Sequence, residues 1–136
     1  MKILHIENGH NLYGGPQQVL YLSNGLKRRG IINVVVCQPD SLLSIKLKES
    51  GIEVINLACR GEWDIFYLFR LIRVIQSEKP DIIHAHSRKG ADFLGGLASR
   101  FLSKKSILSR RVDSIEPKFI SSLIYALFDK VIAISE

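Results

Sequence analysis

The chain has 136 residues, of which 46% are hydrophobic and 24% are charged, and this balance excludes a disordered chain and indicates one globular domain over residues 1–136. Its formal net charge of +6 favours an acidic partner: a phosphorylated small molecule, an anionic membrane surface or a nucleic acid.

The elements can be predicted in chain order. Pro16 suits the first turn of a helix that Gly30 ends, and Asp64 suits the N-cap of a longer helix that Pro80 closes. The β-branched run 34–36 is typical of a strand that is covered on both faces. The predicted strands are 2–6, 32–37, 52–57, 81–86, 106–109 and 130–134. The predicted helices are 16–29, 41–50, 65–79, 91–101 and 119–127.

This alternation predicts an α/β fold, a Rossmann-like parallel sheet of about six strands with helices on both faces. The carboxyl ends of such strands form the ligand crevice, so the loops that follow them are the candidate site. The apolar stripe of the last helix is expected in the core, because helices of α/β folds bury one face. Its members are Phe119, Ile120, Leu123, Ile124 and Leu127.

Neither a targeting segment nor a membrane span is expected. Residues 1–7 become polar too soon for an export signal, and Arg70 and Arg73 interrupt the apolar run 65–75. We therefore expect a cytoplasmic protein, with peripheral contact to the inner face of the membrane as an alternative. The sequence ends directly after a strand, at Glu136, so we also expect it to be part of something longer.

A glycine-rich loop follows the first predicted strand. Gly14 and Gly15 precede Pro16, where glycine lets backbone N–H groups approach a phosphate and the helix start adds partial positive charge. The spacing matches neither G-x-G-x-x-G nor a P-loop. The alternative is a plain strand-to-helix turn that needs glycine geometry.

Two histidines lie on the fourth predicted strand. His84 and His86 are two positions apart and therefore point to the same face. No third ligand has a recognisable spacing, so we predict no metal. His84 is expected to be hydrogen-bonded beneath a helix, whereas His86, nearer the strand end, is expected to face the crevice and titrate near neutrality.

Charged residues follow the fourth and fifth strands. Arg88 and Lys89 suit an anionic ligand or a solvated helix start. Arg110 and Arg111 suit phosphate or carboxylate recognition, unless they form an internal ion pair with Asp113. Nucleic-acid binding is not expected, because the basic residues are scattered and lack interleaved aromatic side chains.

Taken together, these motifs resemble the N-terminal half of a GT-B glycosyltransferase of the group-1 (GT4) type. The resemblance covers essentially the whole chain and rests on the order and spacing of five segments: 1–6, 14–19, 26–30, 79–87 and 129–136. It implies transfer of a sugar from a nucleotide-sugar to an acceptor in cell-surface glycan or glycolipid synthesis, with retained configuration, no metal and no other cofactor. It also implies that Gly14 and Gly15 approach the donor diphosphate.

One position departs from the family pattern. Many members have a histidine after the fifth strand, where this chain has Arg111, and arginine cannot act as a base at neutral pH. Our hypothesis is that Arg111 binds an anionic group while Asp113 or His86 transfers any proton. The nucleotide-binding second half has no counterpart here, so we expect it in the same chain or in a partner, and expect this fragment alone to be inactive.

Three alternatives remain at this point. The first is a non-catalytic nucleotide- or phosphate-binding module, and the second is a membrane-peripheral interaction domain. The third is half of a sugar-nucleotide epimerase, because such epimerases share the GT-B arrangement.

Overall fold

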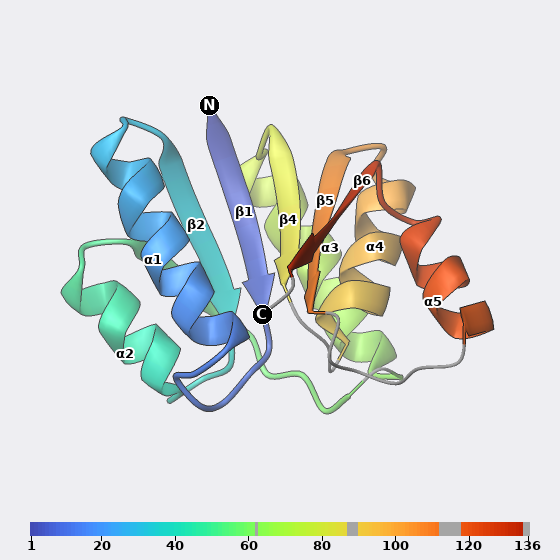
Figure 1. Cartoon of the computed structure of the whole chain (residues 1–136), viewed down its shortest axis with the longest axis horizontal. Coiled ribbons are helices and arrows are strands. Elements are labelled where there is room, and N and C mark those ends of the chain that lie inside the picture. Colours follow the sequence, from blue (N-terminus) through green and yellow to red (C-terminus); the bar gives the residue numbers. More distant parts are fainter. Residues whose placement is uncertain (62, 87–89, 112–117, 135–136) are drawn as a thin grey trace.

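The computed structural model describes residues 1–61, 63–86, 90–111 and 118–134 and shows a twisted sheet between two layers of helices (Figure 1). The strands are β1 (Lys2–Glu7), β2 (Ile32–Cys37), β3 (Glu53–Asn56), β4 (Ile82–His86), β5 (Lys105–Arg111) and β6 (Lys130–Ile134). The helices are α1 (Gly15–Arg28), α2 (Leu42–Glu49), α3 (Ile65–Glu78), α4 (Ala91–Phe101) and α5 (Lys118–Tyr125). The predicted α/β alternation is confirmed.

The six strands form one parallel sheet in the order β3-β2-β1-β4-β5-β6. The chain builds outward from β1 to β3, then returns through α3 to the other side of β1 and builds outward again to β6. Because all the strands run the same way, their carboxyl ends share one edge, which is the lower edge in Figure 1. The Rossmann-like fold predicted from the sequence is therefore correct.

The two faces of the sheet bury different side chains of the same strands. Val34 and Val36 pack in one cluster with residues of α3 and α4, while Val35 and Cys37 pack in another with residues of α1 and α2. All four side chains are fully buried. The continuous apolar run of β2 thus reflects burial on both faces, as predicted.

Local signals set the helix starts. Asp64 caps α3 by accepting a hydrogen bond from the Tyr67 amide at 3.0 Å, and Ser41 caps α2 by accepting one from the Ser44 amide at 3.1 Å. Pro16 lies in the first turn of α1, where its missing N–H costs nothing. The ends of the strands were predicted less accurately. β5 was predicted over 106–109 and extends beyond this range at both ends, to Lys105–Arg111.

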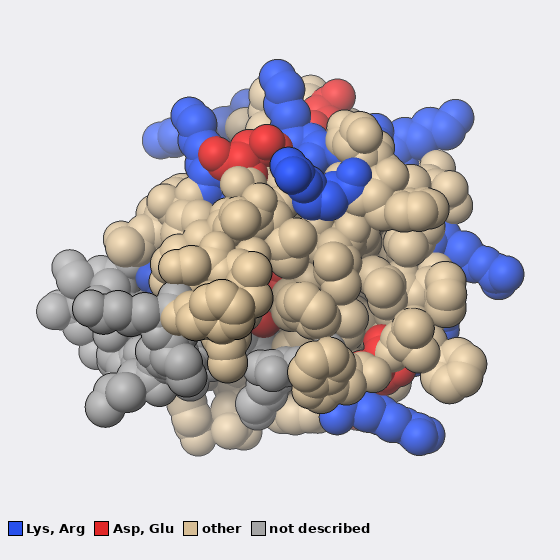
Figure 2. Space-filling model, turned by 90° about the vertical axis from the view of Figure 1, so that its right-hand side faces the viewer, with Lys and Arg blue, Asp and Glu red and all other residues tan. Residues whose placement is uncertain are grey.

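The prediction for the apolar stripe of α5 is largely wrong. Ile124 is buried, but the side chains of Phe119, Ile120 and Leu123 are 73%, 48% and 55% exposed. The helix is short and lies at the edge of the sheet, so only one side of it reaches β5. Figure 2 shows this side of the molecule as a mostly uncharged surface with lysine and arginine side chains along its upper edge.

Within the described residues, no helix is both long and apolar enough to cross a bilayer.

Candidate functional site

The strand order reverses between β1 and β4, and this point defines the candidate site. The chain leaves β1 toward α1 and β2 on one side, and leaves β4 toward α4 and β5 on the other. The loops after the two strands therefore diverge at the carboxyl edge of the sheet. In open α/β sheets, ligands bind in the crevice at such a switch point.

Buried polar side chains anchor the loop after β1. Glu7 Oε1 accepts a hydrogen bond from the Gly9 amide at 2.9 Å, and Asn8 Oδ1 accepts one from the Tyr67 hydroxyl of α3 at 3.2 Å. Gly14, at the end of the loop, has φ 72° and ψ −123°, a conformation that favours glycine. The loop thus has a defined path from β1 to the start of α1.

Two helices begin at this edge beside the switch point. Gly14 caps α1 and Gly90, with φ 94°, caps α4; neither cap residue has a side chain that could bond the first-turn amides. Amides in the first turn of such a helix are available to an anion. Asp92, buried in the first turn of α4, accepts a hydrogen bond from the Phe93 amide at 2.8 Å and so occupies one of these amides; α1 is therefore the better anion site.

Arg110 lies on the α5 side of β5 rather than free in solution. Its side chain is 9% exposed, and its guanidinium carbon lies 5.2 Å from the centre of the Tyr125 ring. This cation–π contact joins β5 to α5. An anchoring role of this kind was not predicted.

The other charged candidates fall partly outside the described residues. Arg88, Lys89 and Asp113 lie there entirely, and so does the side chain of Arg111, whose backbone ends β5. The predicted roles of these four residues in binding the donor or transferring a proton stay predictions.

His84 and His86 point to the same face of β4, as predicted, and their ring centroids are 3.8 Å apart. A third histidine, His5, was not predicted to belong to this group; it pairs with His84 in the register of β1 and β4. His5 Nδ1 lies 3.1 Å from His86 Nε2, and one ring nitrogen from each of the three residues lies within 4.8 Å of the other two. Knowledge of the strand order would have revealed this cluster, because β1 and β4 are neighbours in the sheet.

The prediction that His86 titrates near neutrality is wrong. His86 is 4% exposed, and burial, with smaller effects from His84 and His5, holds its pKa well below the ordinary value. Burial also lowers the pKa of His5 to about 4 and that of His84 to about 3. All three imidazoles are therefore neutral at pH 7, and His86 is buried against its neighbours instead of facing the crevice. This position argues against His86 as a catalytic base.

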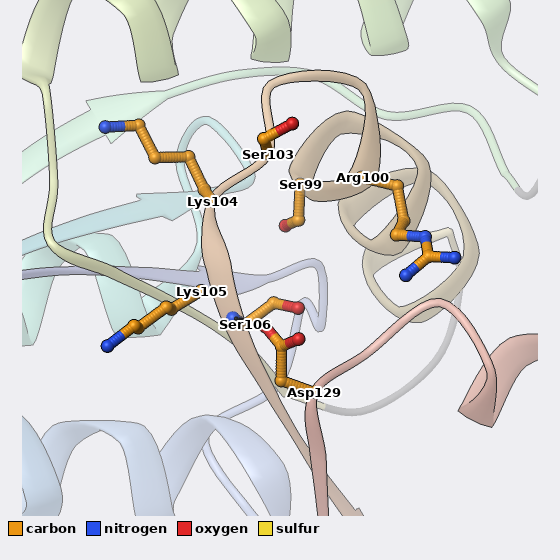
Figure 3. Close-up of a pocket in the computed structure, with 7 residues that line it drawn as sticks. All are labelled: Ser99, Arg100, Ser103, Lys104, Lys105, Ser106 and Asp129. Atoms are coloured by element: carbon orange, nitrogen blue, oxygen red, sulfur yellow. Dashed lines mark hydrogen bonds between the residues drawn. The ribbon is translucent and has the colours of Figure 1, made fainter.

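A cavity of about 330 Å³ lies at the opposite edge of the sheet, near the start of β5. Its charged side chains do not converge: Lys104 and Lys105 extend away from Arg100 (Figure 3). Asp129 Oδ2 accepts a hydrogen bond from the Ser106 amide at 2.8 Å and so holds the turn before β6 against β5. This cavity is remote from the switch point and offers no focused anion site.

The family model that matches this sequence is Glycosyltransferase Family 4, over residues 13–136. The chain belongs to this family. The match includes the Gly14-Gly15 loop and continues through β6. No curated protein matches this sequence.

Solved structures share the fold at low sequence identity. A glycosyltransferase from Rickettsia africae superposes with a TM-score of 0.78 at 20% identity, over 98% of this chain and 36% of that one. Anabaena HepE in complex with UDP and glucose gives 0.72 at 15% identity, over 94% and 36%. A putative UDP-N-acetylglucosamine 2-epimerase from Listeria monocytogenes gives 0.69 at 18% identity, over 97% and 39%. This family 4 chain thus spans less than half the length of each, and its fold corresponds to the N-terminal half of a GT-B enzyme.

Proposed function

We propose that this chain is the acceptor-side half of a family 4 glycosyltransferase that transfers a sugar from a nucleotide-sugar to an acceptor in cell-surface glycan or glycolipid synthesis. The acceptor in this proposal is a sugar or a lipid-linked molecule. The observation that carries the proposal is the family match over residues 13–136, combined with a glycine-rich loop at the switch point of the sheet.

The geometry supports a role for α1 in holding the donor diphosphate. Gly14 lets the chain turn sharply into α1, and the first-turn amides of that helix point at the carboxyl edge of the sheet. When the bond between sugar and diphosphate breaks, negative charge grows on the leaving diphosphate. Fixed amide dipoles aimed at that charge lower the barrier without reorganisation.

Sugar transfer also needs a nucleotide-binding half, which we place in the same protein or in a partner chain. The Rickettsia africae glycosyltransferase, HepE and the putative Listeria epimerase are each more than twice as long as the region that this chain matches. HepE was solved with UDP and glucose, which supports a nucleotide-sugar as the donor class here. In this proposal the 136-residue chain alone does not turn over substrate.

A second candidate is a sugar-nucleotide epimerase, because a putative UDP-N-acetylglucosamine 2-epimerase has the same fold with a TM-score of 0.69. The two reactions have different requirements. A transferase makes a new glycosidic bond only when an acceptor is present, whereas an epimerase changes the configuration of the sugar without one.

The test is a product assay of the chain combined with its second half. UDP- and GDP-sugars are supplied with and without a lipid extract as the source of acceptor, and the products are separated by mass and by sugar configuration. We expect acceptor-dependent transfer of one sugar. Acceptor-independent epimerisation would replace the transferase proposal, and tight nucleotide binding without any turnover would make the chain a binding module.

The loop assignment has its own test. Gly14→Val places a β-branched side chain at φ 72°, where such residues are strained, and brings bulk to the start of α1. We expect at least a tenfold loss in kcat/KM. Gly25→Ala in the same helix is the matched control, because the nearest atom to its new methyl group is 3.9 Å away. Equal activity of both variants would contradict the assignment.

A further inference from the structure

The three buried histidines form a compact group that the proposed sugar transfer does not use. His5 comes from β1, and His84 and His86 come from β4. Their side chains are 0%, 8% and 4% exposed. The group lies on the sheet face that α1 covers, because the Asn33 side chain bonded to His5 also donates to the Ser23 carbonyl of α1.

Hydrogen bonds fix which nitrogen of His5 has a free lone pair. The Asn33 amide group donates to the Ile31 and Ser23 carbonyls at 3.1 and 3.3 Å, so its Oδ1 is the atom facing His5. That oxygen lies 2.9 Å from His5 Nε2 and can only accept. Nε2 therefore holds the proton, and Nδ1 directs its lone pair at His86 Nε2, 3.1 Å away.

This arrangement has the features of a metal site. A ligating histidine usually donates its other ring N–H to a carbonyl or carboxylate, which orients the ring, and Asn33 does this for His5. Two nitrogens bound to one tetrahedral Zn²⁺ at about 2.0–2.1 Å are roughly 3.3 Å apart. The observed 3.1 Å between His5 Nδ1 and His86 Nε2 is close to that separation.

The third histidine completes the ligand set. His84 lies beside His86 with ring centroids 3.8 Å apart and ring planes tilted by 35°, and its Nε2 lies 2.6 Å from the Ser109 hydroxyl of β5. Three imidazoles with an oxygen group nearby suit a four-coordinate ion with nitrogen and oxygen ligands. Neutral imidazole is a good ligand for Zn²⁺, Co²⁺, Ni²⁺ and Cu²⁺.

We propose that His5, His84 and His86 bind one divalent transition-metal ion of this class, with Zn²⁺ as the first candidate, between the sheet and α1. The ion replaces the hydrogen bond between His5 and His86, and the His86 proton moves from Nε2 to Nδ1. The site joins β1 to β4 directly beneath the switch point, so its role is structural. It is independent of the proposed sugar transfer.

The experiment uses the whole 136-residue chain after treatment with a chelator and dialysis. Zn²⁺ is titrated by calorimetry, and Co²⁺ provides a second readout because tetrahedral Co²⁺ absorbs visible light. We expect one ion per chain and a higher thermal unfolding midpoint with Zn²⁺. His86→Gln and His84→Gln should each weaken binding at least tenfold.

The chain offers a matched control, since it has four histidines and the fourth, His10, is exposed. His10→Gln should keep the full affinity. No stoichiometric binding by the unaltered chain, binding that His86→Gln retains, or binding that His10→Gln removes would each overturn the proposal.

A measurement without any variant covers the case in which the substituted chains do not fold. X-ray absorption at the zinc edge of the loaded protein distinguishes imidazole nitrogen from sulfur. We expect a nitrogen and oxygen shell with imidazole scattering. A sulfur shell would assign the metal to Cys37 or Cys59 and would contradict the histidine site.

Discussion

Acidification should destabilise the metal-free chain because three histidines are buried in the neutral form. In the folded chain, burial lowers the pKa of His5 to about 4 and that of His84 to about 3, and holds that of His86 well below 6.5. In the unfolded chain each histidine has its ordinary pKa of about 6.5. Between these values only the unfolded state binds protons, so stability is complete above pH 6.5 and falls as the pH decreases.

The size of this effect follows from linkage. At pH 5.5, one unit below the unfolded pKa, each histidine lowers the free energy of unfolding by about 1.4 kcal/mol, and the three together by about 4 kcal/mol. A small domain has a total stability of about 5–15 kcal/mol, so the loss is easily measured. Carboxylates contribute little in this range, since their ordinary pKa values are near 4.

The assay is urea unfolding of chelator-treated protein, followed by circular dichroism at constant ionic strength between pH 7.5 and 5.0. His84→Gln should reduce the pH dependence by about one proton, whereas His10→Gln at an exposed position should leave it unchanged. An unfolding free energy that stays constant from pH 7.5 to 5.5 would refute the reasoning. So would a slope that His84→Gln does not alter.

Three further substitutions test the packing of the fold by thermal or urea unfolding. Leu71→Ala in α3 removes a fully buried side chain and should cost about 2–5 kcal/mol; a loss under 1 kcal/mol would contradict its place in the core. Asp64→Ala removes the cap of α3 and should lower the free energy of unfolding by about 0.5–2 kcal/mol. An unchanged free energy of unfolding would contradict a stabilising role of this cap. Gly96→Ala should cost about 1–3 kcal/mol, because the added carbon would lie 2.8 Å from Leu127 Cβ. Gly25→Ala should be neutral or stabilising, because its added carbon would meet only the end of the Arg28 side chain at 3.9 Å; equal effects at the two glycines would refute the packing argument.

Much of the fold was predictable because local signals agree with one another. The N-cap at Asp64, the β-branched run in β2 and the regular alternation of strand and helix patterns in the sequence all indicate the same architecture. Each of these features is present in the structure. That architecture also places the Gly14-Gly15 loop at the carboxyl edge of the sheet. The family resemblance agrees with the match over residues 13–136.

The failures concern properties that depend on tertiary neighbours. The stripe of α5 shows that the helix has apolar residues, but not that Ile124 is the one that is buried in the cluster with Leu108 of β5. His84 and His86 share a face by local geometry, whereas their depth depends on α1 and β1. The contact between His5 and His86 joins positions 81 residues apart, and no local pattern records it.

The order of the strands has a consequence for synthesis on the ribosome. β1 occupies the middle of the sheet, yet it is made first, and its two partners, β2 and β4, emerge later. The half formed by β1, β2 and β3 can assemble early, but one side of β1 stays unpaired until Ile82–His86 has been translated. Long-range parallel pairing of this kind is slow, so the nascent chain exposes an apolar strand edge for an extended time and is a natural client for chaperones.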